Sequence, residues 1–172
     1  MSRTRTASSR RTFLAAGTAL GALGLAGCGF KLRQAPDFAF QSMAMPTNTA
    51  YLAQLRRAID VTGKLKVLPM TEVDQAETVF DVLSESRDRL VLSTNSAGQV
   101  RELQLFLRIR FKLRTPQGKE LIGPSEMMQS RDITYNETAA LAKESEEQLL
   151  YRDMINDIVQ QTLRRLAAVK TL

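Results

Sequence analysis

The clearest pattern in the chain is a strict alternation of apolar and polar positions over residues 103–114. The odd positions are large and apolar, namely Leu103, Leu105, Leu107, Ile109, Phe111 and Leu113. The later even positions are all cationic, namely Arg108, Arg110, Lys112 and Arg114. A period of two is typical of a strand with one buried and one open face, whereas a helix would scatter these cations around its surface. The pattern therefore predicts a strand whose open face presents a row of positive charge.

Weaker apolar patterns predict further extended segments at residues 38–45, 64–68, 78–93 and 119–135. The segment 78–93 changes phase, which predicts a bulge or bend near Glu85 to Asp88. The segment 119–135 is interrupted by Gly123 and Pro124.

Two helices are expected. The first is capped by Thr47 or Asn48 and ends at Gly63, and as the link between two extended segments it predicts a βαβ unit with parallel pairing. The second runs from Leu141, or begins only at Ser145 if residues 145–148 form a capping box. Its expected buried stripe consists of Tyr151, Ile155, Ile158, Val159, Thr162 and Leu166.

These elements predict an α+β fold in which two helices pack on one face of a mixed, roughly four-stranded sheet. The other face of the sheet, with its row of cations, is then uncovered and available to a partner. Residues 37–172 are expected to form this single domain.

The N-terminal segment 1–27 has the pattern of an export signal. Arginines at 3, 5, 10 and 11 precede an uncharged run that is shorter than the roughly 20 apolar residues needed to span a bilayer. The Arg10–Arg11 pair fits either a twin-arginine signal or an ordinary secretory signal. Leu25, Ala26, Gly27 and Cys28 look like a bacterial lipobox, which predicts cleavage before Cys28, its acylation, and a membrane-bound tether over residues 28–36. Gly29 rather than aspartate follows Cys28, and by resemblance to enterobacterial lipoproteins this implies the outer membrane as the location.

Removing this segment changes the charge balance. The whole chain of 172 residues carries a formal net charge of +6, from 24 Lys and Arg residues and 18 Asp and Glu residues. Segment 1–27 contains four of these basic residues and no acidic ones, so the remainder has 20 against 18. Global basicity is therefore not an argument for nucleic-acid binding. Binding through a sheet face would need several stacking aromatic residues, and Phe106 is the only one expected there.

The chain has no histidine and a single cysteine, and it shows no glycine-rich phosphate loop, nucleophile elbow or metal-ligand spacing. We therefore expect neither an enzyme nor a cofactor or metal site.

The opening Cys28, Gly29, Phe30, Lys31, Leu32 and Arg33, together with Ala140, Leu141, Ala142 and Lys143, resembles the lipopolysaccharide-assembly lipoproteins of the LptE family. The resemblance implies two helices on a four-stranded sheet and a plug inside the outer-membrane β-barrel LptD, a pair that inserts lipopolysaccharide into the outer leaflet. It also implies a lipopolysaccharide contact for Lys143, which matches a basic position of the family. A second such position falls near Asn95 and Ser96, which are uncharged.

Two functions follow from these observations. The first is a lipid-anchored outer-membrane protein on the periplasmic side, with an LptD-like barrel and lipopolysaccharide as its partners. The second is a freestanding periplasmic lipoprotein that binds lipid or another anion. The row Arg108, Arg110, Lys112 and Arg114 can serve such contacts, or it can pair with acids such as Glu85, Asp88 or Glu126 on neighbouring strands.

Overall fold

The computed structural model describes residues 36–172. The predicted export signal 1–27 and the predicted acylation site Cys28 lie outside the described residues.

Five strands form one mixed sheet in the order β2-β1-β3-β4-β5, one strand more than the expected four. Their bounds are β1 (Ser42–Ala44), β2 (Lys66–Leu68), β3 (Thr78–Thr94), β4 (Val100–Arg114) and β5 (Glu120–Thr134). The three long strands are antiparallel, whereas β1 pairs in parallel with both β2 and β3. The predicted parallel βαβ unit is therefore confirmed.

The helix α2 (Ala50–Thr62) connects β1 to β2. Its cap is Thr49 rather than the predicted Thr47 or Asn48, because the Thr49 side chain accepts a hydrogen bond from the backbone nitrogen of Leu52. The helix ends at Gly63, as expected, with a left-handed φ of 63°.

The helix α3 (Ala140–Ala167) is 28 residues long and follows the short 3₁₀ turn η2 (Glu137–Ala139). The predicted capping box at Ser145 is wrong, because Ser145 Oγ donates to the carbonyl of Leu141 one turn earlier within the helix. A second 3₁₀ segment, η1 (Met70–Gln75), precedes β3.

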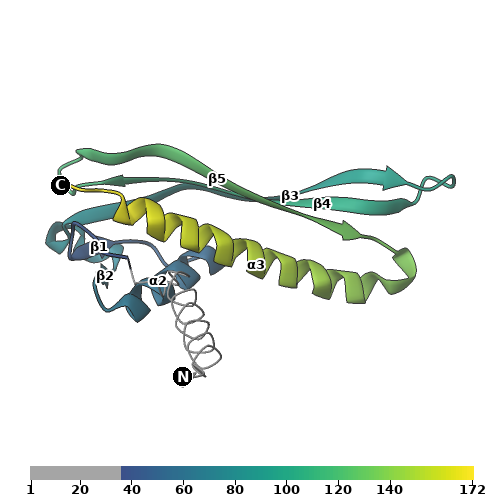
Figure 1. Cartoon of the computed structure of the whole chain (residues 1–172), viewed down its shortest axis with the longest axis horizontal. Coiled ribbons are helices and arrows are strands. Elements are labelled where there is room, and N and C mark those ends of the chain that lie inside the picture. The colour runs from purple at the N-terminus through teal and green to yellow at the C-terminus, as the bar shows by residue number, and fades with distance from the viewer. Residues whose placement is uncertain (1–35) are drawn as a thin grey trace, which may run out of the picture. The chain divides into compact units, whose positions relative to one another are not determined.

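Both long helices pack on the same face of the sheet, and α3 runs along its length (Figure 1). The apolar side chains of β4 face them, and those from Leu105 to Leu113 are fully buried. The predicted stripe of α3 is buried throughout. Within this core, the hydroxyls of Tyr51 and Thr162 lie 2.9 Å apart, and their hydrogen bond joins α2 to α3. Burial raises the pKa of the Tyr51 hydroxyl.

Two of the register shifts in the long strands bear on the predictions from the sequence. The register between β3 and β4 shifts at Leu83, between Val82 and Ser84, so the bulge lies earlier than predicted. Strand β5 continues through Gly123 and Pro124. These two residues lie where the register between β4 and β5 shifts, between the pair Phe111–Ser125 and the pair Leu113–Ile122.

The buried face of β4 provides a stability test. Leu107→Ala should lower the free energy of unfolding by about 2–5 kcal/mol, because Leu107 is fully buried and its truncation leaves a cavity. Leu149→Ala on α3, where the side chain is 56% exposed, is the matched control and should change it by less than about 0.5 kcal/mol. Urea unfolding followed by circular dichroism measures both values, and equal losses would contradict this assignment of the core.

Candidate functional site

The even-numbered side chains of β4 lie on the face of the sheet opposite to α2 and α3, as the alternation predicted. We call this surface the open face. Its neighbours from β3 and β5 follow from the strand register: Ser84 and Glu126 flank Arg110, and Ser86 and Met128 flank Arg108. Neither α2 nor α3 therefore covers these cations.

Acidic residues of β3 pair with three of the four cations. Arg108 Nη1 lies 2.6 Å from Asp88 Oδ2, and its guanidinium lies 5.2 Å from the ring centre of Phe106. Asp81 Oδ2 accepts from Arg114 Nε at 2.7 Å and lies 3.9 Å from Lys112 Nζ. Pairing with Asp88 was one of the expected alternatives, whereas Asp81 was not identified from the sequence.

The fourth cation, Arg110, is exposed and makes no ion pair within residues 36–172. Its register neighbour Glu126 was an expected partner, but no hydrogen bond or ion pair joins the two side chains. Glu85, another expected partner, pairs in register with Ile109 and so lies on the helix side, where its carboxylate is 3.9 Å from Arg87 Nη2. Arg110 is thus the cation of the open face that is available to an external anion.

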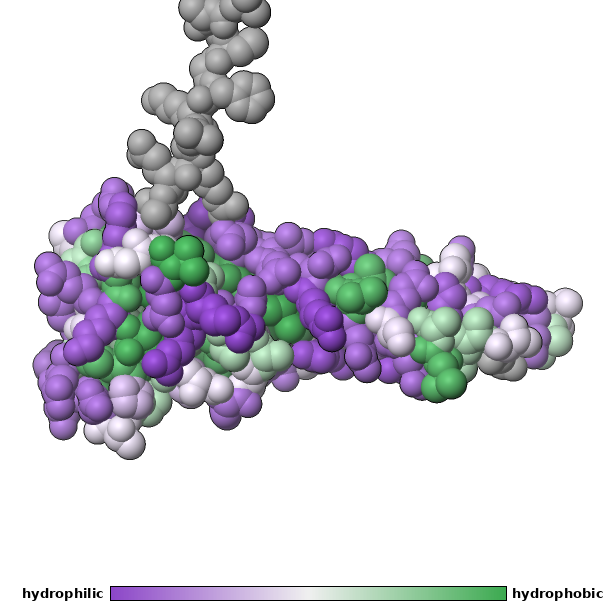
Figure 2. Space-filling view, turned by 90° about the horizontal axis from the view of Figure 1, so that it is seen from below, coloured by the Kyte–Doolittle hydropathy of each residue, from purple (hydrophilic) through white to green (hydrophobic). Residues whose placement is uncertain are grey.

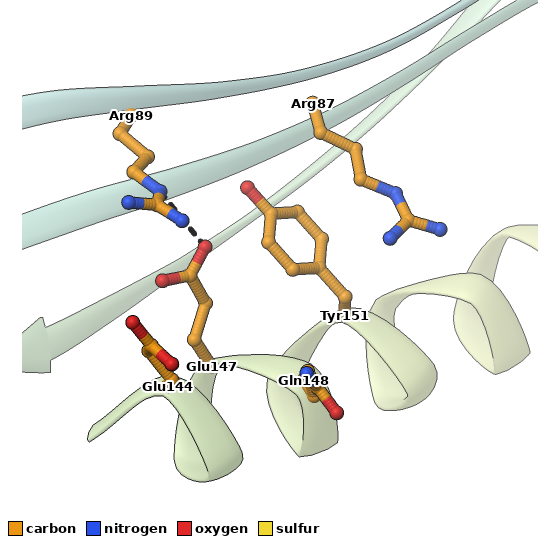
Figure 3. A pocket seen from close by; sticks show the side chains of 6 residues that line it. All are labelled: Arg87, Arg89, Glu144, Glu147, Gln148 and Tyr151. Atoms are coloured by element: carbon orange, nitrogen blue, oxygen red, sulfur yellow. Dashed lines mark hydrogen bonds and ion pairs between the residues drawn. The ribbon is translucent and has the colours of Figure 1, made fainter. Parts of the chain in front are cut away.

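A pocket of about 350 Å³ lies on the other face, between β3 and the first half of α3. It is lined by Arg87, Arg89, Glu144, Glu147, Gln148 and Tyr151 (Figure 3). Arg89 Nε donates to Glu147 Oε1 at 2.9 Å, and the Arg87 guanidinium lies 5.0 Å from the ring centre of Tyr151. Burial, and then the negative charge of Glu147, raise the pKa of Tyr151, whose hydroxyl donates to the Asp88 carbonyl at 3.4 Å.

Sequence reasoning missed this pocket. The available signal was the alternation of Glu85, Arg87 and Arg89, which places three charges on the side of the strand that faces a helix.

Lys143 lies in the first turn of α3, and its side chain is 19% exposed. Its Nζ is 2.8 Å from Glu146 Oε2 and 3.1 Å from Thr134 Oγ1. Thr134 is six residues further along β5 than Met128, the register neighbour of Arg108, which corresponds to about 20 Å. Lys143 and the cationic row therefore form two separate positive positions.

The helix side of the molecule is mostly hydrophilic, with small hydrophobic patches (Figure 2). No helix among residues 36–172 is both long and apolar enough to cross a membrane. In the same residues, no three histidine, cysteine or acidic side chains are grouped as metal ligands would be.

Comparison with known proteins places these features in context. A family model described as LptE, Lipopolysaccharide-assembly, matches residues 39–166. A protein of Pectobacterium atrosepticum named LPS-assembly lipoprotein LptE is 31% identical over 151 residues, which are 84% of this chain and 79% of that protein.

Solved structures share the fold. The solution NMR structure of uncharacterized lipoprotein B from Nitrosomonas europaea gives a TM-score of 0.68 at 31% identity, over 81% of this chain and 91% of that chain. The crystal structure of rare lipoprotein B from Shewanella oneidensis gives a TM-score of 0.62 at 20% identity, over 74% of this chain and 95% of that chain. The α+β fold predicted from the sequence is confirmed.

The ion pairs of the open face differ in burial, which generates a prediction. Asp81→Asn should lower the free energy of unfolding by about 1–2 kcal/mol, because a charged hydrogen bond to Arg114 is lost where the two side chains are only 20% and 25% exposed. Asp88→Asn removes the more exposed ion pair with Arg108 and should lower the free energy of unfolding by less than about 1 kcal/mol. Urea unfolding at low and high salt tests the difference, and a larger loss for Asp88→Asn would refute this ranking.

Proposed function

The chain belongs to the LptE family of lipopolysaccharide-assembly proteins, and from this premise we propose that it is an outer-membrane lipoprotein acting in lipopolysaccharide transport. The family match over residues 39–166 and the relative named LPS-assembly lipoprotein support this role. The lipobox at Cys28 supports the lipid anchor.

The proposed partner is an LptD-like β-barrel that this domain plugs and helps to assemble. The observation that carries the proposal is the open face of the sheet: β4 and its neighbours present charged and apolar side chains there, and no helix within residues 36–172 covers them. Carboxylates of the chain hold three of the cations in place, namely Arg108, Lys112 and Arg114. These side chains contribute to the shape of the open face and present hydrogen-bond donors in fixed directions. Arg110 has no such partner within the described domain and is free to pair with an acidic group of the barrel wall.

Lipopolysaccharide is the second proposed ligand. Its phosphate groups favour charge-assisted hydrogen bonds from Arg and Lys. Arg110 and Lys143 offer such donors at two separate places.

The proposed anchor limits where the domain can work. A tether over residues 28–36 spans at most about 3.3–3.6 Å per residue, or roughly 30 Å in total. The domain over residues 37–172 therefore stays close to the periplasmic side of the outer membrane.

Charge reversal on the open face tests the barrel partnership. Arg110→Glu should reduce the amount of large β-barrel that co-purifies with the chain from detergent-solubilised outer membrane by roughly fivefold or more, because a like-charge contact replaces an attractive one. Arg152→Glu, at an exposed position of α3, is the matched control and should leave recovery unchanged. Recovery of the unmodified chain without any barrel would instead favour a freestanding lipoprotein.

Lys143 has its own test. Lys143→Asp should weaken the binding of lipopolysaccharide to the purified chain at low salt by roughly fivefold or more, since a cation near the phosphates becomes an anion. Glu146→Gln breaks the same internal ion pair but keeps the cation, so it should not weaken binding. If Lys143→Asp and the unmodified chain bind equally, Lys143 has no role in lipid contact.

A further inference from the structure

The outer edge of β3 is unpaired along most of its length. Strand β1 pairs with it only at Thr78 and Val79, and within residues 36–172 no strand lies beside the following residues on that side. The unpaired part of β3 is therefore longer than the usual strand of about 5–6 residues. Between Ser84 and Val91 its pairing with β4 continues without a register shift, so this part is regular. An exposed regular edge is a template for a further strand.

The opposite edge of the sheet is protected. Strand β5 contains the bulge at Gly123 and Pro124, and a proline cannot donate to a ladder of strands. Arg165 Nη2 donates to the Glu126 carbonyl at 3.5 Å, and Arg131 Nη1 donates to the Ser130 carbonyl at 2.8 Å. Strand β3 contains neither proline nor glycine. Of the exposed edges of the two long strands β3 and β5, that of β3 is therefore the one that can accept a strand.

Apolar side chains occupy both faces of this edge. Leu90 and Leu92 are 52% and 45% exposed, and Val91 between them is 49% exposed. The first part of this edge, from Glu85 to Arg89, carries charged residues of the kind common on exposed edges. The three consecutive exposed aliphatic residues that follow favour burial against a partner.

The pocket beside this edge adds specificity. Arg87 and Arg89 project from β3 on the helix side, and α3 forms the opposite wall (Figure 3). In strand addition, backbone hydrogen bonds provide affinity, whereas pockets for alternate side chains provide selectivity. Both arginines would lie beside the helix-side residues of an added strand, where opposite charges stabilise and like charges destabilise the pair.

We propose that the β3 edge between Ser84 and Leu92 binds an extended strand of a partner protein by strand addition. The added strand carries carboxylates on its helix side, next to Arg87 and Arg89. On the open face it carries apolar side chains that cover Leu90. This interaction does not depend on lipopolysaccharide or on the cationic row, so it stands or falls separately from the proposed function.

A synthetic nine-residue peptide of alternating valine and glutamate is the probe. The full chain, purified in detergent, should bind the labelled peptide in fluorescence anisotropy, and amide hydrogen exchange should slow at residues 84–92 and not at 120–134. Two derivatives carry N-methyl groups on one or the other set of alternate residues. A strand pairs with one neighbour through the N–H groups of alternate residues, and an N-methyl group removes such a donor. At least one of the two derivatives should therefore lose binding.

Variants test the charge pattern. Arg87→Glu should weaken peptide binding by roughly fivefold, because a repulsive cross-strand pair replaces an attractive one. Arg152→Glu is the control with the same charge change and should bind normally, while thermal unfolding of both variants verifies that they fold. Binding that survives both N-methylation patterns, protection at 120–134 instead of 84–92, or self-association of the chain through β3 without peptide binding would each overturn the proposal.

Discussion

The structure depends on the alternation of side chains along β4. Long strands pair with it on both sides, and its apolar positions fill the core beneath α2 and α3. A slip of one residue would turn all of these side chains to solvent, and each is worth about 1.5–3 kcal/mol when buried. The register is therefore strongly fixed. The cations must then lie on the other face whether or not a ligand is present, so the core itself determines where the positive row appears.

The bulge at Leu83 divides β3 into two chemically different halves. Before it, Phe80 faces the helices and is fully buried. After it, Glu85, Arg87 and Arg89 face them, and polar contacts with α3 replace apolar packing. The carboxylate oxygen Oε2 of Glu85 is buried there with no hydrogen-bond partner in the described domain. After the bulge, polar side chains of β3 thus contact α3, while the core on this side is filled by the apolar side chains of β4.

The sequence was most informative where one period continued over many residues. The strand 103–114, the buried stripe of α3 and the parallel βαβ unit were all predicted from spacing. Local signals were less reliable: Ser145 matches a capping box, yet packing of the buried stripe is compatible with a helix that starts five residues earlier, and the longer helix forms. The pairing of Asp81 with Arg114 required the exact position of a bulge, and the pocket at Arg89 required the contact between β3 and α3. Neither is encoded in a short motif.

The balance of charges on the open face limits how it can act in the proposed role. Asp81 and Asp88 neutralise much of the row, so long-range attraction to an anionic partner is modest. The more exposed of these ion pairs, between Arg108 and Asp88, contributes little. Docking must then rely on shape and on apolar area around Phe106 and Met128, with Arg110 fixing the orientation. The proposed lipid anchor would make such weak contacts sufficient, because a short tether raises the effective concentration of the domain to about the millimolar range. In the proposed role, the anchor and the moderate charge of the open face are therefore complementary parts of one attachment.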